Sequence, residues 1–332
     1  MILKVTSGLV LSFLIFPKYT FCQSRSQEPI KVITPVRVAE ANKVKLGKML
    51  FFEKRLSDSG LINCNSCHNL SSAAVDNVPF SRGPNWKTSN LNTPTLLNAK
   101  FNIAYNWDGS AKTLLEQIAA HMSEPKIMDS KHPSNLAKLK SIPEYQKLFT
   151  QVYGAKEINL IKVTESVAAF IETLLTPGSR FDKWLNGDGR AITTEEKRGY
   201  ELFKQKGCIS CHSGAAIGSS KFQKFGLVRA YKKDRKTLGR FNVTKQAQDK
   251  YVFKVPTLRN IELTYPYFHN GSVWQLSEAV DVMAWHQLGI KLRRDENRAI
   301  VSFLKTLTGT RPRIDIPALP PSQKRTEKPN TI

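Results

Sequence analysis

Two short cysteine motifs constrain this chain more than any other feature of its sequence. Residues 64–68 read CNSCH and residues 208–212 read CISCH. Two thiols at this spacing can each form a thioether with one haem vinyl group, and the adjacent histidine can then reach the iron. Each motif therefore predicts one covalently bound haem c. The predicted attachment residues are Cys64, Cys67, His68, Cys208, Cys211 and His212.

Other uses of paired cysteines explain the motifs less well. A thioredoxin-like redox pair would need no histidine after the second cysteine, and one shared zinc ion would leave both histidines unexplained. An exported chain with five cysteines would be expected to form disulfides, but four of the five lie within the two motifs. The chain has only five cysteines and six histidines, so two chance matches would be rare.

The motifs belong to a longer internal repeat. The pattern K-x-G-x-x-L-F precedes each motif, at residues 45–51 and 197–203. After the motifs, further segments recur at a constant separation of 162 positions. These are PTLLN at 94–98 with PTLRN at 256–260, and WDGS at 107–110 with HNGS at 269–272. An amphipathic helix followed by C-x-x-C-H is similar to the start of a cytochrome c domain.

The repeat predicts the fold class and the division of the chain. We expect a mainly α protein of two cytochrome c-like domains, related by internal duplication and each holding one covalent haem. Turn-rich composition between residues 177 and 189 marks the boundary. The expected segments are a signal peptide at 1–22, an N-terminal haem domain at 30–180, a C-terminal haem domain at 190–310, and a tail at 311–332 that packs on the first domain or frays.

The N-terminus and the charge suggest where the protein acts. Residues 1–22 combine Lys4, an apolar run from Leu9 to Phe16 and a cleavage region near Cys22. This is typical of a secretory signal peptide, and the run is short for a membrane span. We therefore expect a periplasmic protein, with an uncleaved anchor as the alternative. The net charge of +23 favours anionic partners such as acidic proteins, or serves solubility alone. No nucleic-acid motif is present, so nucleic acid is not expected.

The repeat also pairs two candidate iron ligands. The separation of 162 positions relates His121, in IAAHMSEP, to Met283, in AVDVMAWHQ. Histidine and methionine are the usual side chains at the sixth position of a c-type haem. We expect Met283 to ligate the second iron and His121 to lie on the distal side of the first haem. Core packing for Met283, and a polar or haem-propionate contact for His121, stay open as alternatives.

Residues 35–310 resemble the bacterial di-haem cytochrome c peroxidases. The resemblance rests on both C-x-x-C-H motifs and on NTPTLLNAKFN, NWDGS, FKVPTLRNIELTYPYFHNGS and VMAWHQLG. The wider family includes the di-haem enzymes that mature methylamine dehydrogenase, which have a tyrosine where this chain has Met283. The resemblance implies that the N-terminal haem is peroxidatic and meets hydrogen peroxide. It also implies that the C-terminal haem, at high potential, accepts electrons from a small cytochrome c or cupredoxin. Members often form homodimers.

The resemblance assigns further residues. Trp107 matches a tryptophan that lies between the haems, and Gln117 matches a glutamine of the distal pocket. An interface calcium site is implied at Asn77, Thr264 and Pro266, the last two through their carbonyl oxygens, which suit a hard cation. Core packing is the alternative for Trp107, and a plain turn is the alternative for the calcium site.

Two departures from the family pattern bear on the chemistry. Pro84 stands where the family has a loop histidine, and Ile127 stands where it has a catalytic glutamate. Peroxide cleavage needs a distal group that takes a proton and returns it to the leaving oxygen. His121 is the natural substitute and Glu124 a weaker one. We therefore expect a peroxidase. An oxidase of a protein or small molecule, and an electron carrier in which His121 ligates iron permanently, are the alternatives.

Overall fold

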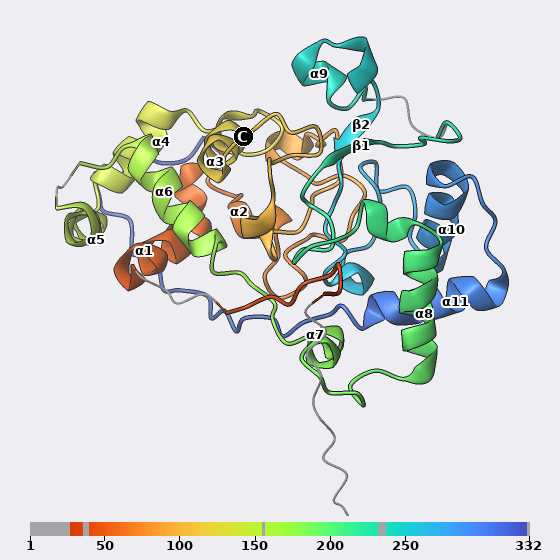
Figure 1. Ribbon diagram of the computed structural model, residues 1–332. Coiled ribbons are helices and arrows are strands. Elements are labelled where there is room, and N and C mark those ends of the chain that lie inside the picture. Colours follow the sequence, from red (N-terminus) through yellow and green to blue (C-terminus); the bar gives the residue numbers. More distant parts are fainter. Residues whose placement is uncertain (1–26, 36–39, 155–156, 232–236, 331–332) are drawn as a thin grey trace, which may run out of the picture.

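The computed structural model describes residues 27–35, 40–154, 157–231 and 237–330, so the predicted signal peptide lies outside the described residues (Figure 1). The fold is mainly helical, as predicted. The helices are α1 (Ala41–Phe51), α2 (Cys64–Cys67), α3 (Leu114–Ser123), α4 (His132–Lys140), α5 (Pro143–Tyr153), α6 (Leu160–Ile171), α7 (Arg180–Leu185), α8 (Thr194–Gln205), α9 (Phe241–Thr244), α10 (Leu276–Gln287) and α11 (Arg294–Lys305).

A single small sheet accompanies these helices in the described part of the chain. Strands β1 (Phe222–Lys224) and β2 (Val252–Lys254) pair antiparallel, with Phe222 opposite Lys254. Short 3-10 turns connect many of the loops. Two of them, Ala99–Phe101 and Ile261–Leu263, follow the repeated PTLLN and PTLRN segments and so obey the repeat. No helix of the described residues is long and apolar enough to cross a membrane.

The first hydrophobic core forms where α1 crosses α6. A Cβ atom at Gly47 would lie 1.8 Å from the carbonyl oxygen of Ser166, so only glycine allows this approach. One turn further along α1, the ring of Phe51 meets the ring of Phe170 edge-on, with centroids 5.4 Å apart. Helices α3, α4 and α5 complete this core, and Figure 1 shows them gathered around the α1–α6 pair.

The second core repeats this crossing with α8 and α11. A Cβ atom at Gly199 would lie 1.9 Å from the carbonyl oxygen of Ala299. Phe203 meets Phe303, with ring centroids 5.2 Å apart. In both halves, therefore, the glycine of the K-x-G-x-x-L-F segment allows the close helix crossing, and the phenylalanine packs against a phenylalanine of the second helix. The internal duplication predicted from the sequence is confirmed in the packing of the two helix pairs.

The loops after the cysteine motifs are also duplicated. Thr95 donates its hydroxyl to the carbonyl of Ala73 at 2.6 Å, and Thr257 donates to the carbonyl of Ala216 at the same distance. These bonds fold each PTL segment back against the turn that follows its own C-x-x-C-H motif. Backbone bridges between 105 and 111, and between 267 and 273, then shape the two WDGS and HNGS turns alike.

The two halves meet through a reciprocal pair of backbone hydrogen bonds. The N–H of Lys254 donates to the carbonyl of Trp107 at 2.8 Å, and the N–H of Asn92 donates to the carbonyl of His269 at 2.8 Å. Residues 92 and 254 are equivalent in the repeat, and so are 107 and 269. The exchange is therefore that of a twofold interface, with each half giving and receiving the same bond.

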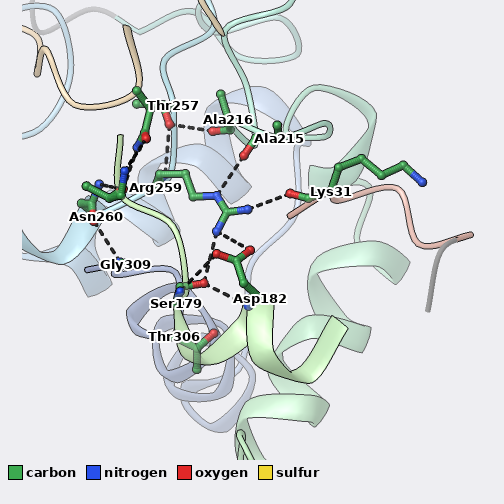
Figure 2. A network of polar contacts seen from close by, with 12 residues as sticks. Lys31, Ser179, Asp182, Ala215, Ala216, Thr257, Arg259, Asn260, Thr306 and Gly309 are labelled. Carbon is green, nitrogen blue, oxygen red and sulfur yellow. Dashed lines mark hydrogen bonds and ion pairs between the residues drawn. The ribbon is translucent and has the colours of Figure 1, made fainter. Parts of the chain in front are cut away.

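A buried arginine gathers the segments around the second core (Figure 2). Arg259 is fully buried and forms an ion pair with Asp182 of α7 at 2.8 Å. Its guanidinium also donates to Ser179 Oγ at 3.1 Å, to the carbonyl of Ala215 at 2.9 Å and to the carbonyl of Lys31 at 2.7 Å. One side chain thus joins the connection between the halves, the loop after the second cysteine motif, and the N-terminal segment.

Both ends of the described chain return to a core. Residues 27–33 precede the first core in sequence but pack on the second, where Ile30 is buried. The C-terminal tail lies along the first core, where Ile314 and Leu319 contact it and Arg55 donates to the carbonyl of Pro320 at 2.9 Å. The domain limits of 30–180 and 190–310 stay a prediction.

The glycine crossings generate a stability prediction. Gly199→Ala should lower the free energy of unfolding by about 1–3 kcal/mol, because the added methyl group forces α8 away from the backbone of α11. Gly189→Ala is the matched control, because a Cβ there meets nothing within 4 Å. Denaturant unfolding of both variants measures the difference. Equal midpoints for the two variants would contradict the close crossing.

Candidate active site

A first cavity lies between α2 and α3. Its wall includes Cys64, Cys67 and His68 on one side and Gln117 and His121 on the other. Helix α2 is fixed at its start by Asn63, whose side chain accepts from the N–H of Ser66 at 3.1 Å. This cap sets the helical turn that brings the two thiols of the motif to the same cavity.

The histidine of each motif is held in the form that binds iron. His68 Nδ1 lies 3.3 Å from the carbonyl oxygen of Ala74, and His212 Nδ1 lies 3.3 Å from that of Ile217. A carbonyl oxygen only accepts, so Nδ1 carries the proton and Nε2 keeps its lone pair. Burial lowers the pKa of each imidazole to about 4, so both are neutral at pH 7.

The cysteines of the two motifs are free for covalent attachment. Burial raises the pKa of Cys64 to about 12 and those of Cys67 and Cys208 to about 11. The four described cysteines form no disulfide. A cavity flanked by two thiols and one neutral imidazole fits a haem joined by thioethers, and each half supplies one.

His121 is fixed by a residue that the sequence reasoning missed. Gln117 and His121 stand one turn apart on α3, and both bond to Oδ1 of Asn106, at 3.2 and 3.0 Å. Asn106 has a φ of 62°. Asparagine tolerates this left-handed conformation better than most residues, so its place before the WDGS turn was an available signal.

The hydrogen bonds of Asn106 assign the protons of His121. Asn106 donates its amide to Ser110 Oγ at 2.9 Å, so its oxygen is the atom that faces the imidazole. His121 Nε2 must then donate, which leaves Nδ1 able to take up a proton. Burial lowers the pKa of His121, and the nearby Glu124 partly opposes this. The imidazole is therefore neutral near pH 7.

The other predicted distal residues are placed less centrally. Glu124 lines the first cavity but is exposed. Ile127 lines it too and packs on the first core, so an aliphatic side chain occupies the position of the family's glutamate. Pro84 is buried in a separate turn that packs against the backbone of Lys126, since a Cβ at Gly83 would lie 2.1 Å from the carbonyl oxygen of Lys126.

A second cavity lies beside the second motif. Cys208, Cys211 and His212 line it, together with Met283 of α10. Helix α10 is the counterpart of α3 in the repeat, so Met283 and His121 occupy equivalent places in two cavities. The structure therefore brings each predicted sixth-position residue to the cavity of its own cysteine pair.

Trp107 lies between the two cavities and lines both. Its indole N–H donates to the carbonyl of Asn92 at 2.8 Å, and its ring lies 6.2 Å from that of His269, its counterpart in the repeat. These contacts hold the indole at the interface, where the reciprocal backbone bonds also meet. The tryptophan is thus placed as an electron path between the two cofactors would require.

The residues assigned to calcium meet at the same interface. Asn77 Nδ2 lies 3.1 Å from the carbonyl oxygen of Leu263 and 2.7 Å from that of Tyr265. Thr264 and Pro266 continue this segment and line the second cavity. One half therefore supplies an amide group and the other a run of carbonyl oxygens.

Comparisons with known proteins agree with this arrangement. The sequence model described as di-haem cytochrome c peroxidase matches residues 41–190, and that of cytochrome c matches residues 196–308. The chain is 48% identical to a cytochrome c551 peroxidase of Nitrosomonas europaea, over 91% of this chain and 89% of the relative. It is 41% identical to a cytochrome c551 peroxidase of Pseudomonas aeruginosa, over 86% and 84%.

A solved structure shares the fold. It is a MauG-like protein associated with microbial copper homeostasis, 25% identical, with a TM-score of 0.74. The match covers 90% of this chain and 96% of that protein.

Proposed function

Because the chain belongs to the di-haem cytochrome c peroxidase family, and is therefore an oxidoreductase that carries two haem c groups, we propose that it reduces hydrogen peroxide to water. Two electrons and two protons convert one peroxide into two waters. A small redox protein would supply the electrons. The signal-like sequence at residues 1–22 supports a periplasmic location.

The two cavities divide the work. When bound, the haem of the first cavity would supply the iron at which the peroxide O–O bond breaks, and that of the second would receive electrons from the donor. His68 and His212 would hold the haem irons through Nε2, and Met283 would supply a sulfur ligand in the second cavity. Trp107 would provide the electron path between the two haems.

The observation that carries the proposal is His121, fixed by Asn106 in the same cavity as His68. His121 Nδ1 would accept a proton from one oxygen of hydrogen peroxide. The same imidazole would then return that proton to the other oxygen, which leaves as water. Glu124 favours the transient imidazolium, because a nearby carboxylate stabilises the charged form. Gln117 shares the oxygen of Asn106 and so steadies the acceptor that fixes His121.

His121→Ala tests this proton transfer. Loss of a positioned acid–base group should lower kcat/KM for peroxide by about 10²- to 10⁴-fold, without loss of haem. His132→Ala is the matched control, because His132 bonds to Ser123, the last residue of α3, and does not line the cavity. Steady-state kinetics with a dye donor measures the effect.

Spectra of the same variant separate the peroxidase from the electron carrier. In a carrier, the wild-type protein would be low-spin in every redox state, and His121→Ala would become high-spin and reactive toward peroxide. That result would overturn the acid–base role. Unchanged turnover and an unchanged spectrum would show that His121 has neither role.

The interface also supports a calcium ion. The carbonyl oxygens of Thr264 and Pro266 accept no hydrogen bond from any described residue. The amide of Asn77 already lies within 3.1 Å of two neighbouring carbonyls, and a half-turn of this amide would present its oxygen instead. In the structure Asn77 meets the carbonyls of Leu263 and Tyr265, which neighbour Thr264 and Pro266 in the same segment, and amide and carbonyl oxygens suit a hard cation. We infer that calcium binds here and ties the halves together.

Asn77→Leu should abolish calcium binding, because it removes the side-chain oxygen and leaves only carbonyls. Calorimetric titration of the holoprotein with calcium, after chelation, measures this. Asn242→Ala is the control, since Asn242 is exposed on α9 and bonds only locally to Thr237. Calcium binding that survives in Asn77→Leu would refute the site.

The electron donor is expected to dock on a basic face beside the second cavity. This face comprises Lys221, Lys224, Leu227, Val228 and Arg229. Lys221 Nζ donates to the carbonyl of Ser210, inside the second motif, at 2.6 Å. The N–H of Val228 donates to the carbonyl of His286 on α10 at 3.1 Å.

The chemistry of the basic face selects its partner. Leu227 and Val228 are 53% and 58% exposed, and the exposed Lys224 and Arg229 stand on either side of them in the sequence. An apolar centre with a cationic rim suits a small acidic cytochrome c or cupredoxin. The basic face is bonded to the second cysteine motif and to α10, and both of these line the second cavity. A donor bound on this face would therefore deliver its electrons to the second haem.

Charge reversal tests the docking. Lys221→Glu with Lys224→Glu should slow reduction by an acidic donor by about tenfold at low ionic strength, and the difference should shrink as salt is added. Lys140→Glu with Lys147→Glu, on the exposed sides of α4 and α5 at the first core, is the control (Figure 1). Stopped-flow reduction measures both. Equal rates for the two double variants would exclude this face.

A further inference from the structure

The two halves of the repeat differ in their buried charges. Lys254 of the second half corresponds to Asn92 of the first, and Arg259 corresponds to Leu97. The second half thus carries two buried cations where the first carries an amide and an alkyl group. All four side chains are buried. Duplication alone would have given the two cavities the same surrounding charges. The extra buried cations of the second half therefore call for a physical reason.

Of the two cations, only Arg259 has its charge met by the protein. Asp182 lies 2.8 Å from its guanidinium. Lys254 is 8% exposed, and within the described residues its ammonium has one partner, Oδ1 of Asn102 at 3.0 Å. No carboxylate among those residues forms an ion pair with Lys254. Burial lowers its pKa to about 8, which still leaves it mainly charged at pH 7.

The place of this ammonium indicates what should neutralise it. Lys254 ends β2 and lines the second cavity, together with Asn102 and Trp107. An ammonium group has three donors, and one amide oxygen satisfies only one of them. A buried charge is costly unless an opposite charge and further acceptors meet it. A haem brings two propionate carboxylates into its cavity, and these are the anions that the site otherwise lacks.

We propose that Lys254 binds a carboxylate of the second haem and, through its positive charge, makes that haem the easier of the two to reduce. Addition of an electron is favoured near a cation, and the effect is large where water is excluded. The first cavity has no such charge at the equivalent place, because Asn92 is neutral and donates its amide to the carbonyl of Val78 at 2.9 Å.

The inference sets the direction of electron flow across the interface between the two halves. The backbone N–H of Lys254 bonds to the carbonyl of Trp107, so the residue that carries the cation is next to the one that separates the cavities. An electron from the donor would rest on the second haem until the first haem reacts with peroxide. The inference rests on the di-haem assignment and the electron path of the proposed function, but it requires no peroxide turnover.

Redox titration of the holoprotein tests the proposal. Lys254→Met keeps an unbranched side chain, one heavy atom shorter, and removes its charge. The equilibrium constant for reduction of the second haem should fall at least tenfold, which is about 59 mV for a one-electron couple. The first haem should shift less. Optical titration resolves the two steps, and EPR of the half-reduced protein assigns them.

Three further variants make the result specific. Lys254→Arg keeps the charge and should keep the wild-type order of reduction. Lys250→Met removes an exposed charge nearby and should shift neither step by more than twofold. Lys254→Gln should behave as Lys254→Met, and it replaces that variant if the methionine lowers haem content. Wild-type titration curves in both neutral variants would overturn the proposal and leave the peroxidase assignment intact. Shifted potentials in the Lys254 variants, in a protein whose wild type does not turn over peroxide, would keep the proposal and overturn the peroxidase assignment.

Discussion

The reciprocal backbone bonds between the halves are the constraint on which the rest of the structure depends. Lys254 donates to Trp107, and Asn92 donates to His269. Because each half contributes the same donor and acceptor, the two cavities are held back to back, with the tryptophan between them. The positions of the proposed electron path, of the calcium site and of the proton-transfer residues all depend on this arrangement of the two halves. A slip of either segment would separate the cavities.

Duplication explains the frame, and divergence explains the chemistry. The helix crossings at Gly47 and Gly199, and the threonine bonds of the PTL segments, are preserved almost atom for atom. The residues that attach the haems are likewise the same in both cavities. Other side chains that face the cavities differ: the first half has His121 where the second has Met283, and Asn92 where the second has Lys254. The halves thus share their frame and differ at a few positions beside the cofactor.

The sequence was informative wherever spacing determines structure. A constant separation of 162 positions was enough to place His121 and Met283 in equivalent cavities, because no insertion interrupts the repeat after PTLLN. The spacing alone did not reveal Asn106: its place before the WDGS turn suggested the backbone conformation, but its bond to a side chain fifteen residues away had no signal in the sequence. The burial of Lys254, and the packing of residues 27–33 on the second core, depend on long-range contacts that no local pattern encodes.

The residues that follow α6 and α11 show why the symmetry must be broken at its centre. Thr176 and Gly309 each donate a backbone N–H to the oxygen of a repeated asparagine, Asn98 or Asn260. The two counterparts also touch, since a Cβ at Gly309 would lie 2.0 Å from the carbonyl oxygen of Thr176. The single hydroxyl of Thr176 accepts from the amides of both asparagines, at 2.8 and 2.9 Å. Two identical subunits would crowd two threonines into this space, so a fused chain can hold here what a homodimer of its halves could not.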